Sequence, residues 1–575
     1  MKSRTSFFNG TILKKDITRF APVWGIYSVI LLLYLLALTT VERSSQMAYE
    51  LASLIPGMAS ANGVYGFVCA LFLFSDLFNP RLCNAQHAMP LRREGWFLTH
   101  CTSGLLFGLV PYAVMAGLSC CWLGHFSYMA AIWLIVAVLQ YLFFFGVGVF
   151  SAMCAGNRLG MLAVYSIINF LSMIVYVVVE SFFMPTLKGV RLSSELFEFF
   201  CPLWNLSQNN YVAVDYNYDR MKLVWQGFLG SSCAYLGVCA AIGAGLCALA
   251  LLVYRKRKLE NAGDFLAVKP LSVVFLIIYT LGIAVFCYQM GKDLDLGLVF
   301  LAVGLIVGFF TGRMFLERKV NVFKPKSFLG FGVFVAVLAL LMGLSWMDIF
   351  GIAAYVPKTE QIESVRIFDQ TVTSNAYKYI KGLDLTEPEE LEEITAIHKE
   401  LTQLPEASGM CVTLVYQLKD GRTVRRYYEM EATGPQGQRL KPYFSRWQYV
   451  FGMDDWAQLE AQAFGVIVEN YANNRTLAIG DHRFTENFVG KDANYLLKLE
   501  DGDVAPVMAL LEAVRKDCDA GNMAQAYDYM YYKEEDLGWI ELHVGEDRVI
   551  GLHYNEDATN IVACLEKLFD QSEAQ

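Results

Sequence analysis

The sequence of 575 residues lacks the short motifs that mark most enzymes and nucleotide-driven motors. It has no GxxxxGK[ST] phosphate loop, because the Gly-Lys pairs at Gly291 and Gly490 are each followed by Asp, which places no hydroxyl for Mg²⁺. It also has no GxSxG, HExxH or Gly-rich dinucleotide loop. We therefore expect no enzyme activity in this chain, and if ATP drives the protein, another chain binds it.

The sequence also has few residues placed to form disulfide bonds or to bind a metal. Of the 14 cysteines, only Cys411, Cys518 and Cys564 lie beyond residue 350, and an odd count without CxxC spacing predicts neither a disulfide framework nor a metal site. The 7 histidines are scattered along the chain. No cofactor and no nucleic-acid partner are expected.

Long apolar runs are what the sequence has in abundance. The chain is 55% hydrophobic with a mean hydropathy of +0.38, and its apolar residues gather in blocks of about 20, the length that crosses a bilayer. No cleavable signal peptide is expected, because the first block is too long for one. The nine predicted membrane spans are 21–41, 62–77, 102–123, 129–154, 161–184, 228–254, 271–290, 296–316 and 328–346.

Basic residues are distributed unevenly between alternate loops. With a cytoplasmic N-terminus, the inner segments carry 19 Lys and Arg residues and the outer loops carry 6. This bias predicts a multi-pass protein of the bacterial cell membrane with the N-terminus inside. Nine spans then place the C-terminal domain outside the cell.

Four regions are predicted along the chain. Residues 1–20 form an interfacial elbow helix with a basic face, residues 21–254 hold six spans, residues 255–349 hold three more, and residues 350–575 form an extracellular α+β domain. The fold class is thus a polytopic α-helical membrane protein with a C-terminal α+β domain.

The C-terminal domain is predicted in two similar parts. The first has a strand at 363–369, a helix at 386–403 with Thr386 as its N-cap, and a hairpin at 410–430 turning at Asp420-Gly421. The second has a strand at 476–481, a helix at 504–518, a hairpin at 539–554 and a last helix at 558–569. The repeated order suggests a duplicated β-α-β-β unit.

A polar and basic segment, Asn79–His100, interrupts two apolar runs. It is longer than a turn requires and combines helix-start chemistry with aromatic residues that we expect to be exposed. The candidate contact residues for a separate motor are Pro90, Arg92, Arg93, Glu94, Trp96 and Phe97. The arginines alone also suit a simpler role, holding the topology beside anionic lipid, and Pro90 suits the first position of a helix.

Two stretches resemble a known family. AMPLRREGWFLTH, Ala88–His100, is similar to the Leu-Pro-x-x-Arg-x-x-x-aromatic segment before the third span of bacterial ABC-2-type export permeases, with Met89 where Leu is common. YRKRKLENAGDFLAVKP, Tyr254–Pro270, resembles the basic exit after the sixth span in a Gram-positive branch that adds further spans and an extracellular domain. The resemblance implies an ABC-2-like core at 21–254 with a coupling segment at 79–100, an ABC ATPase subunit as partner, and a homodimer or heterodimer of permeases.

The expected function is therefore the permease subunit of an ATP-driven exporter. Glu180, near the outer end of the fifth span, is the one intramembrane charge that suggests a substrate path. A membrane-anchored sensor or immunity protein with an extracellular ligand-binding domain is the alternative. A proton-coupled carrier comes third, because no chain of acidic residues lies at mid-membrane.

Overall fold

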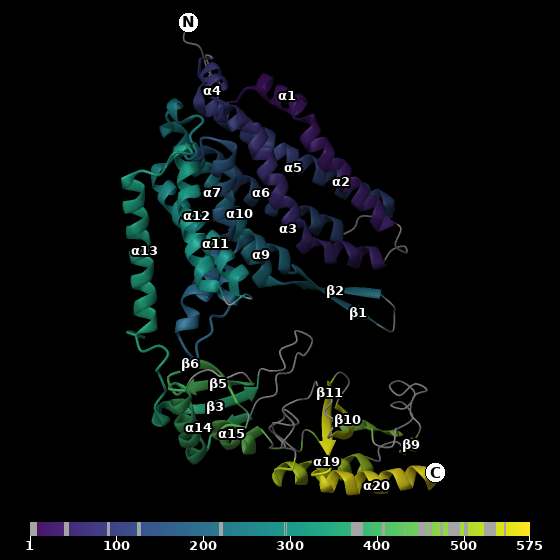
Figure 1. The fold of residues 1–575 in the computed structure, drawn as a ribbon. Coiled ribbons are helices and arrows are strands. Elements are labelled where there is room, and N and C mark those ends of the chain that lie inside the picture. The colour runs from purple at the N-terminus through teal and green to yellow at the C-terminus, as the bar shows by residue number, and fades with distance from the viewer. Residues whose placement is uncertain are drawn as a thin grey trace. The chain divides into compact units, whose positions relative to one another are not determined.

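The chain divides into two compact units in the computed structural model (Figure 1). The helical unit comprises Met1–Phe183 and Leu192–Met342, and the C-terminal unit comprises Met184–Arg191 and Gly343–Gln575. The structure describes residues 8–39, 45–88, 92–123, 128–217, 222–292, 294, 296–369, 383–404, 409–431, 433–444, 446, 457, 459, 463–471, 475–480, 495–499, 504–522, 536–544 and 548–574.

The helical unit contains a helix at each of the nine predicted spans, together with four shorter helices. They are α1 (Gly10–Arg19), α2 (Ala21–Thr39), α3 (Ser45–Leu73), α4 (Pro80–His87), α5 (Arg93–Leu123), α6 (Tyr128–Cys154), α7 (Arg158–Phe182), α8 (Glu195–Phe199), α9 (Pro202–Gln208), α10 (Gly230–Lys256), α11 (Lys269–Lys292), α12 (Gly297–Glu317) and α13 (Pro325–Trp346).

Within the described residues, seven helices are long and apolar enough to cross a membrane: α5, α6, α7 and α10 to α13. Helices α1 and α2 form a pair bent by 58° that adds an eighth crossing if it counts as one span, and the apolar part of α3, Gly57–Leu73, is shorter. The chain is thus a multi-pass membrane protein by length and composition. The total of nine spans and the sidedness of the ends remain predictions.

Helix α6 lies at the centre of the helical unit, packed against α3, α5, α7 and α10. Glycines let the neighbouring backbones approach it closely: a Cβ on Gly146 would lie 2.2 Å from the carbonyl oxygen of Gly243 in α10. Small residues are the usual means of close helix packing in membranes, where the hydrophobic effect does not drive association. The α6–α10 contact therefore depends on both glycines.

The loop between α7 and α10 forms short helices and a hairpin. Its apolar middle is divided into α8 and α9, and α9 packs against α3. The strands β1 (Val212–Asn217) and β2 (Lys222–Phe228) then pair antiparallel. This hairpin was not predicted.

The first sheet of the C-terminal unit has the order β4-β3-β5-β6. Its strands are β3 (Ile362–Asp369), β4 (Leu383–Leu385), β5 (Met410–Leu418) and β6 (Thr423–Met430), all antiparallel, with helices α14 (Pro388–Leu401) and α15 (Pro435–Phe444). The apolar face of α14 shares one core with this sheet. The predicted N-cap, Thr386, is wrong by one residue: Glu387 is the N-cap, because Pro388 occupies the first helical position.

The second sheet has the order β11-β10-β7-β8-β9. Its strands are β7 (Ala463–Asn470), β8 (Arg475–Gly480), β9 (Tyr495–Lys498), β10 (Asp536–Val544) and β11 (Arg548–Asn555), and helices α19 (Ala505–Asp519) and α20 (Thr559–Ala574) join its core. Here β7 lies between β8 and the β10–β11 hairpin, whereas β3 pairs directly with β5 in the first sheet. Along the described part of the chain, two strands precede α14 in the first part and three precede α19 in the second, and the strand orders of the two sheets also differ.

A short segment from the middle of the chain, Met184–Arg191, belongs to the C-terminal unit. The backbone N–H of Tyr427, in edge strand β6, donates to the carbonyl oxygen of Gly189 at 3.0 Å. Gly189 has a φ of +69°, and a Cβ there would lie 2.5 Å from the ring of Tyr428, so only glycine suits the position. The segment thus covers part of an exposed sheet edge.

Candidate coupling site

The two stretches that carry the family resemblance meet in the helical unit. Arg93 begins α5, and its Nη1 donates to the carbonyl oxygen of Arg257 at 3.4 Å, just after the end of α10. Glu94 in the first turn of α5 forms an ion pair with Arg255 at 3.2 Å. We call these four residues, together with Trp96, Phe97 and Tyr254, the junction cluster.

Arg257 is the buried centre of the junction cluster, with 8% of its surface exposed. Its guanidinium donates to the carbonyl oxygens of Ala152 at 2.9 Å and Met153 at 3.3 Å at the end of α6, and of Leu77 at 3.2 Å in the turn after α3. A cation at helix C-termini meets the negative end of the helix dipole and satisfies carbonyls that have no partner in the helix. One side chain therefore ties the ends of α3, α6 and α10 together.

Trp96 and Phe97 lie in the core of the cluster, and the expectation that they are exposed is wrong. Only 6% of Trp96 and 2% of Phe97 is accessible. Their rings lie 5.7 Å and 5.9 Å from that of Tyr254, centroid to centroid, and both contact Phe74, directly after α3. Tyr254, 157 residues after Phe97 in the numbering, supplies the surface that buries them. Their burial therefore gives them a packing role that holds α5 in place.

The remaining predicted site residues lie in different places. Pro90 lies outside the described residues, and Arg92 is exposed directly before α5. Glu180 is half-buried two residues before the end of α7, and its Oε2 has no hydrogen-bond partner within the described part of the chain. The structure therefore gathers Arg93, Glu94, Trp96 and Phe97 and leaves Glu180 apart on α7.

Helix α4 provides an exposed face that the sequence reasoning missed. Cys83 is its buried anchor, at 2% exposure, while Arg81, Leu82 and Asn84 are exposed, Leu82 by 46%. The Asn79 side chain caps the helix by accepting from the N–H of Arg81 at 3.0 Å, and Pro80 follows at the first helical position. That Asn-Pro pair is the sequence signal that could have located this helix.

The loop after α10 closes against the turn between α6 and α7. Its Gly263 N–H donates to the carbonyl oxygen of Gly156 at 2.8 Å, and the Ala267 N–H donates to that of Cys154 at 2.8 Å. Gly263 has a φ of +95°, and a Cβ on Gly156 would lie 2.3 Å from the carbonyl oxygen of Asp264. Backbone contacts thus fix this loop on the same group of helix ends.

The elbow helix α1 is attached to α5 through polar contacts. The N–H of Asn9 donates to the Thr99 hydroxyl at 3.2 Å, and the Ser103 hydroxyl donates to the buried carboxylate of Asp16 at 2.7 Å. The same Asp16 oxygen lies 2.7 Å from Nδ1 of His100. A displacement of α5 is therefore expected to carry α1 with it.

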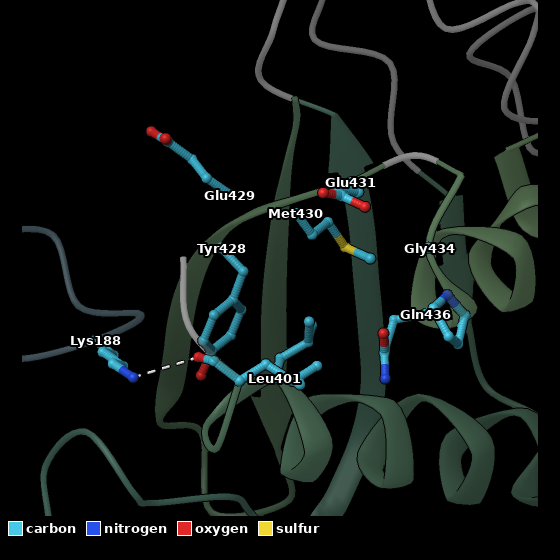
Figure 2. Close-up of a pocket in the computed structure, with 10 residues that line it drawn as sticks. Lys188, Leu401, Tyr428, Glu429, Met430, Glu431, Gly434 and Gln436 are labelled. Atoms are coloured by element: carbon cyan, nitrogen blue, oxygen red, sulfur yellow. Dashed lines mark hydrogen bonds between the residues drawn. The ribbon is translucent and has the colours of Figure 1, made fainter. Parts of the chain in front are cut away.

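The C-terminal unit holds a pocket of about 230 Å³ (Figure 2). The ring of Tyr428 lies between Lys188 and Leu401, whereas the side chain of Glu429 points away from them. The ammonium of Lys188 donates to the carbonyl oxygen of Leu404 at 3.3 Å. Small-molecule sites usually measure about 300–1,000 Å³, so this pocket is small for an organic ligand.

Behind the pocket, His398 is fully buried between two tyrosines. Its Nε2 lies 3.0 Å from the Tyr428 hydroxyl and its Nδ1 lies 2.9 Å from the Tyr416 hydroxyl. Burial, assisted by the positive charge of Arg426, lowers the pKa of His398 to about 3. The imidazole is thus neutral at physiological pH and supplies no acid–base chemistry there. Within the described residues, no group of three His, Cys, Asp or Glu side chains could hold a metal.

The fold is that of a multi-pass α-helical membrane protein with a strand-containing C-terminal region. Comparison of this chain with protein-family models, with curated proteins and with solved structures finds no match.

Proposed function

We propose that this chain is the membrane-spanning permease subunit of an ATP-driven exporter of the ABC-2 type, powered by a separate ATPase subunit. The junction cluster is the observation that carries the proposal. It joins the two stretches that resemble the family and connects the start of α5 with the ends of α3, α6 and α10. Such a connection suits helices that must move together.

Helix α4 is the element that meets the ATPase in this proposal. It follows α3 and precedes α5 in the chain, exposes Arg81, Leu82 and Asn84, and buries Cys83. Force applied to this helix passes to α3 and α5 along the chain and to α6 and α10 through Arg257. Arg92 extends the same surface, and Trp96 and Phe97 keep α5 rigid behind it.

The rest of the assembly follows from the resemblance. Two such permeases, identical or related, form a dimer in a bacterial cell membrane, with the N-terminus in the cytoplasm and the C-terminal domain outside. Substrate passes between the two cores, and Glu180 lies along the outer part of that path. The sensor hypothesis has less support, because the pocket of the C-terminal unit is small and His398 behind it is neutral.

The test is association with an ATPase subunit. We would purify the tagged full chain from membranes of its native host after mild crosslinking, identify the bound subunits, and measure ATP hydrolysis by the purified complex. We expect Arg81→Glu and Leu82→Ser each to reduce the recovered ATPase at least about fivefold. Lys326→Glu is the matched charge reversal, since Lys326 is also exposed and lies outside α4. Purification of the unmodified chain without any nucleotide-hydrolysing subunit would overturn the proposal.

A further inference from the structure

A groove of about 760 Å³ lies along α2 and α3. Its lining is mostly apolar, and Ile26, Ile30 and Val64 are each more than half exposed, so the groove opens on the outer surface of the helices. Its size falls within the range of about 300–1,000 Å³ that ligand sites occupy. An open apolar groove on a membrane helix faces lipid.

The walls of the groove offer carbon and no free hydroxyl. The Tyr27 hydroxyl lies 2.8 Å from that of Tyr112, and the Tyr65 hydroxyl donates to the carbonyl oxygen of Phe107 at 2.7 Å. The rings of Tyr27 and Tyr65 stack at 3.6 Å. The third hydroxyl in the lining, that of Ser75, donates to the carbonyl oxygen of Phe72 at 2.8 Å. The groove walls therefore suit a hydrocarbon chain as the bound group.

Two arginines supply the polar end of the groove. Arg19 ends α1 and Arg158 begins α7, and both line the groove. Asp76 pairs with Arg19 at 3.4 Å and also accepts from Gln86 at 2.7 Å. Arg158 is exposed, and its side chain makes no hydrogen bond or ion pair within the described residues. Two cations beside one carboxylate leave a net positive charge for an anion.

We propose that this groove binds one anionic phospholipid, with an acyl chain along the tyrosine wall and its phosphate between Arg19 and Arg158. The guanidinium fork matches phosphate geometry better than a point charge does. Basic pockets between membrane helices are a known setting for acidic headgroups. The proposal does not depend on transport, because it rests on the lining alone.

A lipid in this position acts on the bend between α1 and α2. Arg19 before the bend and Tyr27 after it both line the groove, and residues of α3 form the other wall. Since α1 is attached to α5 through Asp16, an occupied groove fixes α2 between α3 and the elbow. The lipid is then a structural component of the first two helices.

The test is lipid binding to the purified full chain, measured by native mass spectrometry. Dioleoyl phosphatidylglycerol is titrated against dioleoyl phosphatidylcholine, which has the same chains. We expect one tightly bound phosphatidylglycerol, with phosphatidylcholine at least about tenfold weaker. Inorganic phosphate in millimolar excess should not displace the lipid, because the acyl chain contributes to binding.

Two pairs of variants complete the test. Arg158→Gln should weaken phosphatidylglycerol binding about tenfold, while Lys326→Gln should not. Val64→Trp fills the groove and should abolish the tight site, while Val333→Trp, at a similarly exposed valine of α13, should leave it. Equal binding of both lipids, displacement by phosphate, or wild-type affinity in correctly folded Arg158→Gln and Val64→Trp proteins would each overturn the proposal.

Discussion

Nη1 of Arg93 lies 3.4 Å from the carbonyl oxygen of Arg257, although 164 residues separate the two along the chain. The contact joins the first residue of α5 to the residue directly after α10. It brings two basic segments, each unremarkable on its own, into a single group of helix ends.

Arg257→Ala should destabilise the helical unit. Removing the guanidinium leaves buried carbonyl oxygens at Ala152, Met153 and Leu77 without their donor, and each buried unsatisfied group costs about 1–3 kcal/mol. The matched control is Arg255→Ala, because the Arg255 side chain is 50% exposed and its ion pair with Glu94 is worth less than about 1 kcal/mol. Thermal unfolding followed by size-exclusion chromatography compares the two. Equal losses would contradict the role given to Arg257.

Phe97→Ala should act through stability and not through a surface contact. Truncating a buried Phe costs about 3–5 kcal/mol in a packed core, and Phe97 is 2% exposed. Its neighbour Leu98, 38% exposed, provides the control Leu98→Ala, with an expected loss below about 1.5 kcal/mol. Melting temperature and ATPase recovery should fall together for Phe97→Ala, whereas Leu82→Ser should lower recovery alone. A Phe97→Ala protein of normal stability that fails to recover ATPase would restore Phe97 as a contact residue.

Gly146→Leu should disrupt the α6–α10 contact. The new Cβ would lie 2.2 Å from the carbonyl oxygen of Gly243, so the two helices must separate. Overpacking of this kind costs about 1–3 kcal/mol or more. Gly245→Leu, in α10 with no heavy atom within 4 Å of its Cβ, should be tolerated. The yield of monodisperse protein in detergent distinguishes the two, and tolerance of both would argue against the close crossing.

The C-terminal unit should lose stability in mild acid because of His398. The pKa of about 3 in the folded state lies below the value of about 6.5 in the unfolded chain, so the unfolded chain binds more protons between them. Stability is therefore complete above about pH 6.5 and falls by up to about 1.4 kcal/mol per pH unit below it. Pulse proteolysis of the full chain in urea, between pH 5 and 8, measures the urea concentration at which half of the C-terminal unit is unfolded. His398→Gln should remove this contribution to the change of stability with pH. An unchanged pH dependence in the variant would show that His398 is not its cause.

The predicted topology has a direct test. Nine spans and a cytoplasmic N-terminus place a C-terminal tag outside, where protease added to intact cells should remove it. An N-terminal tag in the same cells is the control and should survive. A protected C-terminal tag would mean an even number of spans, such as the eight counted when α1 and α2 form one crossing and α3 none.

The sequence predicted those elements whose signals are local. The β5–β6 hairpin follows from Asp420-Gly421 between alternating strands, and α14 follows from its apolar period after an acidic turn. Strand β4, with three residues, was too short to carry a pattern. Strand β7 was also missed, and its place between β8 and β10 depends on pairing partners distant in the sequence.

The candidate site could be predicted only in part, for the same reason. Position and charge indicated Arg93 and Glu94, and both lie in the junction cluster. The burial of Trp96 and Phe97 could not be deduced, because Tyr254 covers them from another helix. Arg257 looked like one more cytoplasmic cation, and only the three carbonyl oxygens around it reveal a different role.

Because Met184–Arg191 belongs to the C-terminal unit, two separate segments of the chain form this unit. Truncation of the chain at residue 343 would remove Tyr427 and Tyr428 but keep Gly189. The glycine would then lose the contacts that its position requires. The C-terminal unit is therefore not a simple extension at the end of the helical unit. A truncation that removes the C-terminal unit cleanly must therefore alter the loop after α7 as well.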